Sequence, residues 1–139
     1  MSALVDTSVW SLALRRKARD LSVSEVTIVA ELAHLIPEGR VRIIGLVRQE
    51  VLSGIKTPGQ YEKLLGILRA FSDEQIGTPD YEAAALVSNK CRAKGVAVSV
   101  SDMLICAVAL SRDWPIFTVD PDFKNYARVL PIELHTPRK

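Results

Sequence analysis

Four acidic residues at widely separated positions could together bind a divalent cation: Asp6, Glu50, Asp102 and Asp120. If their carboxylates meet, each pair about 5 Å apart repels by roughly 3 kcal/mol at an effective dielectric constant near 20. Four carboxylates make six pairs, or on the order of 20 kcal/mol, which a marginally stable domain cannot hold without compensation. A bound cation relieves this repulsion, and all-oxygen ligation suits Mg²⁺ or Mn²⁺.

Two of these acids end predicted strands. Asp6 follows the apolar run 3–5, and Asp120 follows the run 115–119. Short apolar strands that alternate with helices favour a mostly parallel sheet covered on both faces. Ligand sites in such sheets lie beyond the carboxyl ends of the strands, so we expect both carboxylates at one edge.

The other two acids belong to predicted helices. Ser99-x-x-Asp102 is a helix start and places Asp102 in the first turn of an apolar helix. Glu50 lies within a short helix, 46–55, that follows the β-branched strand 41–44. Both can therefore project toward the same edge of the sheet.

Hydroxyl residues flank the strand-end acids, and each acid also has a simpler interpretation. We expect Thr7, Ser8 and Thr118 to hold carboxylates in place by hydrogen bonds. An Asp after a strand or at a helix start commonly only caps backbone N–H groups. Asp122 is equally consistent with an extra metal ligand and with such a cap.

The remaining helix-start signals and apolar runs complete an α/β pattern. The capping box Ser22-x-x-Glu25 begins a helix over 26–36, and Thr-Pro pairs begin two more. These two helices cover 58–71 and 79–94, and further strands are expected at 75–77 and 130–134. The whole chain, 1–139, is predicted to be one domain: a three-layer α/β/α sandwich with about five mostly parallel strands.

Composition narrows the function classes without choosing among them. The net charge of +2 is too small to argue nucleic-acid binding by itself. No run approaches the ~20 apolar residues of a membrane span, and the first residues do not resemble a signal peptide, so we expect a cytoplasmic protein. Cys91 and Cys106 are predicted to be reduced, and neither histidine has zinc-ligand spacing to them.

Four segments together resemble PIN-domain proteins, especially VapC-type toxins of toxin–antitoxin systems. They are LVDTSVW at 4–10, RQEVLSGI at 48–55, SDMLICAVAL at 101–110 and IFTVDPDF at 116–123. The resemblance implies a PIN-like fold with Asp6, Glu50, Asp102 and Asp120 in the family's four acidic positions. It also implies a Mg²⁺- or Mn²⁺-dependent endoribonuclease, a cognate antitoxin partner and a homodimer. Cys106 departs from the alanine usual there, and we expect it only to pack in the core.

RNA must approach an acidic site, so basic residues near it are of interest. The strongest basic cluster consists of Arg15, Arg16, Lys17 and Arg19, and Arg48 is one more cation near Glu50. Such side chains would contact phosphates and give affinity rather than sequence choice. A second group, 90–94, is at least as well explained as a solvated helix end. Trp10 is expected in the core or an interface rather than stacked on a base.

Three other functions remain open on the sequence alone. One is a non-catalytic PIN-like module that binds RNA or protein, although such a module has no need of four repelling acids. Another is a phosphotransfer domain with Asp6 as nucleophile, which lacks its second acid because Ser8 stands there. The third is a nuclease directed at DNA.

Overall fold

The computed structural model describes residues 1–139 and has a parallel sheet at its centre. Its strands are β1 (Ala3–Val5), β2 (Val41–Arg42) and β3 (Ile116–Phe117), in the order β2-β1-β3. All of β1 is buried, as expected for the central strand of a sheet covered on both faces.

The expectation of about five strands is wrong in number. Two further segments each touch the sheet through a single bridge, Ile43 to Asp73 and Ile116 to Leu134. The strand expected at 75–77 is absent. Pro131 and Pro137 lie on either side of the second bridge, and because proline has no N–H donor, they limit how far a ladder can extend there.

Seven helices and one 3₁₀ turn surround the sheet. They are α1 (Thr7–Leu14), the turn η1 (Ala18–Asp20), α2 (Val23–Leu35), α3 (Gly45–Leu52), α4 (Pro58–Leu68), α5 (Thr78–Ala93), α6 (Val100–Arg112) and α7 (Asp122–Tyr126). The predicted capping box is present at α2, where Ser22 and Glu25 bond each other's backbone N–H groups. Gly95, which ends α5, has φ of +75°, a conformation that favours glycine.

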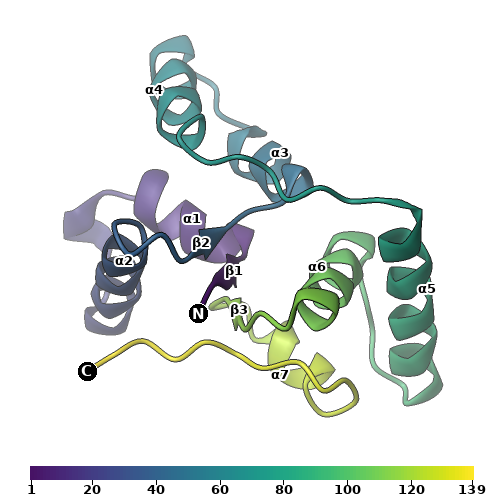
Figure 1. Ribbon diagram of the computed structural model, residues 1–139. Helices are drawn as coiled ribbons and strands as arrows, with labels where there is room; N and C mark the ends of the chain where they lie inside the picture. Colours follow the sequence, from purple (N-terminus) through teal and green to yellow (C-terminus); the bar gives the residue numbers. More distant parts are fainter.

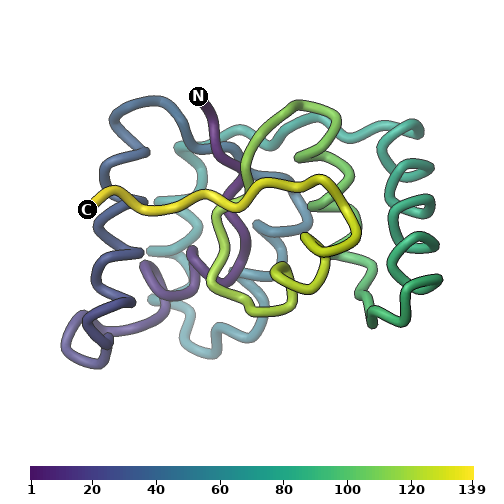
Figure 2. The backbone as a smooth tube through the Cα atoms, turned by 90° about the horizontal axis from the view of Figure 1, so that it is seen from below, coloured from purple at the N-terminus to yellow at the C-terminus, as the bar shows by residue number.

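The layers follow the expected α/β/α arrangement. Figure 1 looks nearly along the strands, with α1 and α2 on one side of the sheet and α6 and α5 on the other. Helices α3 and α4 lie beyond the β2 edge, and the carboxyl ends of the strands meet at one side of the molecule, near α7 (Figure 2). The predicted fold class is therefore confirmed. None of the helices combines the length and apolar character needed to cross a bilayer.

One hydrophobic core joins the layers and fixes the helix that carries Asp102. Seven consecutive residues of α6, 103–109, are buried between the sheet and α5. Because this helix is sealed on nearly all sides, the position of its first turn is rigidly set relative to β1 and β3. Cys91 and Cys106 are buried here as free thiols. Trp10 is also in the core, edge-on to Phe71 at 5.3 Å between ring centroids.

Candidate metal centre

Asp6 lies at the end of the central strand and is held by hydroxyl groups. Its backbone N–H donates to Phe117 O at 2.9 Å, which ties the end of β1 to the end of β3. The side chain is only 5% exposed, and its Oδ2 accepts from Ser8 Oγ and Thr118 Oγ1, each at 2.8 Å. The predicted role of these two hydroxyls in holding a carboxylate therefore has a direct geometric counterpart.

The same hydroxyls also order the loop after β3. Val119 N donates to Ser8 Oγ at 3.0 Å, and Asp120 N donates to Thr118 Oγ1 at 3.0 Å. Thr118 thus contacts both strand-end acids, one through its O–H and one through its oxygen. This network sets where Asp120 lies relative to Asp6.

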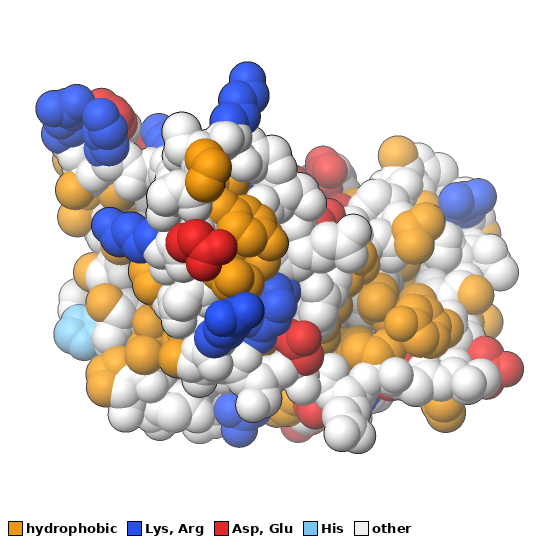
Figure 3. All heavy atoms as spheres, turned by 90° about the horizontal axis from the view of Figure 1, so that it is seen from above, with side chains coloured by type: hydrophobic (Ala, Val, Ile, Leu, Met, Phe, Trp, Pro, Cys, Tyr) orange, Lys and Arg blue, Asp and Glu red, His pale blue; other side chains and the backbone are white.

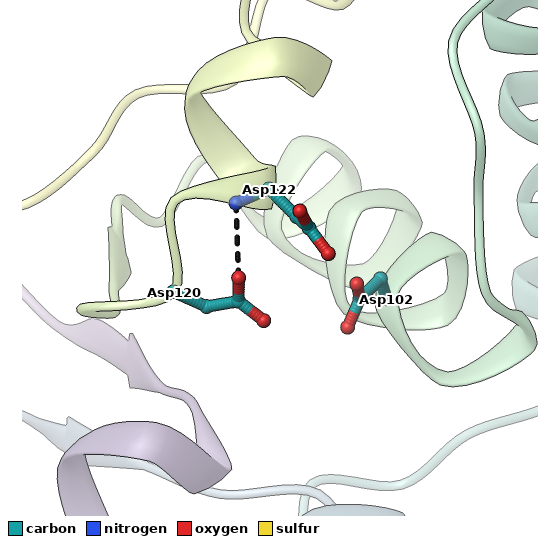
Figure 4. Close-up of side chains that lie close together, drawn as sticks. All are labelled: Asp102, Asp120 and Asp122. Carbon is teal, nitrogen blue, oxygen red and sulfur yellow. Dashed lines mark hydrogen bonds between the residues drawn. The ribbon is translucent and has the colours of Figure 1, made fainter.

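Three carboxylates gather where α7 begins: Asp102, Asp120 and Asp122. One oxygen from each lies within 4.8 Å of the others, close enough to share a metal ion. Figure 4 shows the three side chains facing a common space, Asp102 from α6 and the other two from the turn into α7. Asp122 N donates to Asp120 Oδ1 at 2.9 Å, so Asp122 orients its neighbour as well as offering a carboxylate.

Asp102 has a partner that the sequence analysis did not find. The hydroxyl of Tyr126, in α7, donates to Asp102 Oδ2 at 2.6 Å, and Tyr126 is only 2% exposed. Burial raises the pKa of Asp102, the bond from Tyr126 opposes that rise, and the charges of Asp6 and Asp120 add to it. Tyr126 follows Asp102 by 24 residues, and no spacing rule in the sequence links the two.

Glu50 lies outside the group of three, and Thr7, at the start of α1, orients its carboxylate. Thr7 Oγ1, in the first turn of α1, donates to Glu50 Oε1 at 2.7 Å. Thr7 follows Asp6 directly, so this bond ties α3 to the end of β1. Neither Asp6 nor Glu50 belongs to the three-carboxylate group, although the charge of Asp6 contributes to the raised pKa of Asp102.

A single pattern unites the four acids that the sequence analysis selected. In each, one oxygen accepts a hydrogen bond from the chain, and the other has no donor: Asp6 Oδ1, Glu50 Oε2, Asp102 Oδ1 and Asp120 Oδ2. None of these free oxygens is sealed from solvent, because Trp10 Nε1 is the one buried side-chain polar atom without a partner. Oriented, unpaired carboxylate oxygens in an anionic cluster suit a hard divalent cation such as Mg²⁺ or Mn²⁺.

The basic residues divide into free and engaged groups. Arg15, Lys17 and Arg19 are exposed, and Figure 3 shows Lys and Arg side chains gathered at its upper left, over the link between α1 and α2. Arg16 bonds Asp20 O at 3.3 Å and lies 3.8 Å from Glu25.

The guanidinium of Arg48 is fully engaged in hydrogen bonds within the chain. It donates to Asp73 Oδ1 at 2.9 Å, Leu68 O at 2.8 Å and Phe71 O at 2.5 Å. Because these contacts use all three nitrogens of its guanidinium, we leave Arg48 out of any nucleic-acid surface and assign it to holding α3 against the segment after α4.

The fold and its oriented carboxylates define an α/β domain with an acidic cluster at the carboxyl edge of its sheet that could hold a metal ion. The sequence matches the PIN domain over residues 3–129, and the chain belongs to the PIN-domain family. A search of curated proteins found no match.

Several solved structures share the fold. One is FitAcB from Neisseria gonorrhoeae, at 20% identity and a TM-score of 0.76, with 97% of each chain covered. Another is VapBC2 from Rickettsia felis bound to a DNA fragment from its promoter, at 17% identity and a TM-score of 0.75, covering 97% of this chain and 98% of that one. A third is VapBC-5 from Mycobacterium tuberculosis, a member of the VapBC family of toxin–antitoxin systems, at 20% identity and a TM-score of 0.68, with 96% of each chain covered.

Proposed function

We propose that this protein is a metal-dependent endoribonuclease and the toxin of a toxin–antitoxin pair. The observation that carries the proposal is the set of carboxylates at the sheet edge, each held by one oxygen with the other free. Asp6 also caps α1, since its Oδ2 accepts from Ser8 N at 3.4 Å, but this bond uses the same oxygen that the hydroxyls hold. Each of the four acids therefore keeps one oxygen free of any donor from the chain.

Asp102, Asp120 and Asp122 would hold the metal together with Asp6, and Glu50 would position it or its water. A bound Mg²⁺ or Mn²⁺ supplies a water of lowered pKa and a charge that stabilises the phosphodiester transition state. Ser8 and Thr118 keep Asp6 in one orientation, Thr7 does so for Glu50, and Tyr126 does so for Asp102. The expected products carry 5′-phosphate and 3′-hydroxyl ends, as the family resemblance implies.

The exposed cations at the α1–α2 link would attract the RNA. Arg15, Lys17 and Arg19 make no ion pair within the chain, so their charge is available to phosphates. Arg16 would contribute in part, since it also faces Glu25. These contacts give affinity that falls as salt concentration rises.

A cognate antitoxin and a second copy of the chain are the proposed partners, in a cytoplasmic setting. Support comes from the structures that share the fold, one of which is a member of the VapBC family of toxin–antitoxin systems. The outer faces of α2 and α4 carry exposed apolar side chains, with Val23 88% and Val26 50% exposed on α2. Such faces suit burial against a partner helix.

Cleavage assays with purified protein test the proposal. Single-stranded RNA and DNA pools of randomised sequence are incubated with Mg²⁺, Mn²⁺ or EDTA, and the product ends are mapped. We expect RNA cleavage that requires the metal and disappears in Asp102→Asn, whose side-chain oxygen can still accept from Tyr126. Asp113→Asn is the matched control, because Asp113 is exposed at the other end of α6, at a φ of +57° that asparagine tolerates.

Each contrary result has a distinct meaning. Cleavage of DNA alone would make the protein a DNA-directed nuclease. Binding of RNA without cleavage under any metal would make it a non-catalytic module. Equal loss of activity in both Asp→Asn variants would point to a defect of folding rather than of the metal centre.

A further inference from the structure

Two hollows flank the three-carboxylate group, one on each side of α7. The first has a volume of about 410 Å³ and shares Thr118 and Asp120 with the metal centre. The second has a volume of about 310 Å³ and shares Asp122 with it. Both volumes lie within the range of about 300–1,000 Å³ typical of small-molecule sites. The acids therefore lie between two recesses that are continuous with them.

The first hollow combines an apolar wall with a polar rim. Its apolar lining comes from α2, the loop after β3 and the C-terminal segment: Ile28, Val119, Pro121 and Leu134. Ser24, Glu25 and Lys124 line it as well, and Val119 is 41% exposed. The carboxylate of Glu25 accepts from Ser22 N at 2.9 Å and lies 3.8 Å from Arg16, so its charge is partly balanced. Apolar side chains beside a hydroxyl and a cation match the needs of one nucleotide, whose base is apolar on its faces and whose phosphate is anionic.

The second hollow is polar and carries another cation. Asn125 and Arg128 line it beside Asp122, together with the turn at 95–97. Neither Lys124 nor Arg128 forms an ion pair or a side-chain hydrogen bond within the chain, in contrast to Arg112 and Arg138. One uncommitted cation thus stands on each side of the carboxylates, where flanking phosphates of a strand in the site would lie.

We propose, on the basis of the nuclease function proposed above, that single-stranded RNA crosses α7 between these two hollows. The base of a nucleotide next to the scissile phosphate enters the hollow lined by Val119 and Leu134, and phosphates on either side contact Lys124 and Arg128. Recognition of an unstacked base in a recess is how proteins commonly read single-stranded RNA. The first hollow is then a determinant of which nucleotide stands beside the cleaved bond.

The test narrows the hollow by a substitution on α2, a helix that carries none of the proposed metal ligands. Ser24→Trp places a bulky side chain at an exposed position that lines the hollow, while Val26→Trp, on the same helix, does not line it and is the matched control. Cleavage of the randomised RNA pool is measured at rising protein concentrations under single turnover. We expect Ser24→Trp to raise the half-saturating concentration about tenfold, the loss that follows when one base loses its contacts. The maximum rate and the Mn²⁺-induced rise in melting temperature should stay those of wild type.

Charge variants test the flanking contacts independently. Lys124→Ala and Arg128→Ala should each weaken binding about threefold and lower the dependence of log affinity on log salt by about one. Lys90→Ala, an exposed lysine of α5 away from both hollows, is the control. Sequencing the cleaved ends should reveal a base preference in wild type that Ser24→Trp relaxes.

The outcomes separate this inference from the function on which it rests. If wild type cleaves RNA while Ser24→Trp, Lys124→Ala and Arg128→Ala all behave like their controls, the subsite is overturned and the nuclease stands. If wild type does not cleave, the nuclease proposal fails, and anisotropy of a labelled RNA pool decides the rest. Weaker binding in Ser24→Trp than in Val26→Trp would then keep the hollow as an RNA site, and equal binding would eliminate it.

Discussion

Two clusters of acidic side chains, each assembled from distant parts of this chain, differ in whether the chain itself supplies cations to balance their charge. At the sheet edge, Asp102, Asp120 and Asp122 face one another with no cation from the chain among them. The second cluster is centred on Glu31, a buried residue of α2. Glu31 accepts from Arg138 Nε at 2.7 Å and lies 2.5 Å from His135 Nε2. We name the second cluster the C-terminal clasp: Glu31, Glu38, His135 and Arg138. Figure 2 shows the C-terminal segment lying across α2 at this point.

The two clusters shift pKa values in opposite directions. In the clasp, burial pushes the pKa of Glu31 up, but the bonds from His135 and Arg138 outweigh it and the net shift is downward. Arg138, with a smaller contribution from Arg40, lowers the pKa of Glu38 to about 2. At the metal centre, burial raises the pKa of Asp102 and the neighbouring acids add to the rise. The chain cancels its own charges in the C-terminal clasp, and it leaves them uncancelled at the sheet edge, where we propose that a cation from solution binds.

The largest effect is expected from neutralising one acid of the metal centre. Asp102→Asn should abolish cleavage while raising the melting temperature in EDTA by about 2–4 °C, the shift for about 1 kcal/mol. Because the folded-state pKa of Asp102 is raised, its ionised form destabilises the metal-free fold at neutral pH, and that penalty fades as the pH falls through the raised pKa. The excess stability of the variant should therefore shrink on acidification, which melting curves across pH will measure.

Adding Mn²⁺ should shift the difference in stability between wild type and Asp102→Asn in favour of wild type. With saturating Mn²⁺, wild type should gain more stability than Asp102→Asn, since ligand binding stabilises the folded state more strongly as affinity rises. A variant that melts lower than wild type in EDTA would show that Asp102 is a structural cap, and the contrast between the two clusters would fail.

Neutralising the buried acid of the clasp should have the reverse effect on stability. Glu31 is only 3% exposed, and Glu31→Gln leaves Arg138 and His135 facing a neutral amide. Breaking a fully buried ion pair on one side costs about 3–5 kcal/mol, but Arg138 is 42% exposed and glutamine keeps some of the hydrogen bonds, so we expect a loss of about 1.5–3 kcal/mol. Denaturant unfolding will measure it, and the cleavage rate of the folded variant should be unchanged.

Glu82→Gln provides the baseline for that measurement. Glu82 is exposed on α5 and makes no ion pair or hydrogen bond within the chain, so its variant should unfold like wild type. If Glu31→Gln matched it, the clasp would contribute nothing to stability, and burial alone would not distinguish the two clusters.

The sequence located the acids but not the groups that orient Asp102. Asp6 and Asp120 follow apolar runs, and a strand's end is readable because burial of parallel strands leaves a continuous apolar stretch. The hydroxyls of Thr7, Ser8 and Thr118 were also accessible, since they adjoin the acids. Tyr126 was not, because its contact with Asp102 depends on how α7 packs against α6, which no local pattern encodes.

The errors in the fold have the same origin. The strands expected at 75–77 and 130–134 were inferred from local apolar character, yet the chain at or beside each segment meets the sheet in one bridge. How far a ladder extends depends on the neighbouring edge and on where proline removes a donor within it, and a local apolar pattern shows neither. The clasp was equally invisible, because Glu31 and Arg138 are more than a hundred residues apart.

A smaller effect is expected at Tyr126, which orients Asp102 of the proposed metal centre by a hydrogen bond. Tyr126→Phe removes the hydroxyl that orients Asp102 and keeps the ring, which packs edge-on to Phe123 at 5.2 Å between centroids. Loss of such a supporting bond lowers metal affinity by about 10–100-fold. The Mn²⁺ concentration for half-maximal cleavage should rise by this amount, while the rate at saturating Mn²⁺ changes little. Tyr81→Phe, exposed on α5, is the control, and a fall in the saturated rate with unchanged Mn²⁺ dependence would contradict a positioning role.

The smallest effect concerns the exposed end of the clasp and appears only in its pH dependence. The pKa of Glu38 is lowered from 4.5 to about 2, mainly by Arg138 through bonds of 2.9 Å to each carboxylate oxygen and to a smaller extent by Arg40 at 3.1 Å. A depressed carboxyl pKa stabilises the fold above the unfolded value, and that contribution is lost as the pH falls through the folded one. The melting temperature of wild type should therefore exceed that of Arg138→Gln at pH 7, and the gap should narrow between about pH 4.5 and pH 2. A gap that stays constant over this range would mean that Arg138 acts by packing its stem along α2, and the clasp would then owe its stability to contact rather than to cancelled charge.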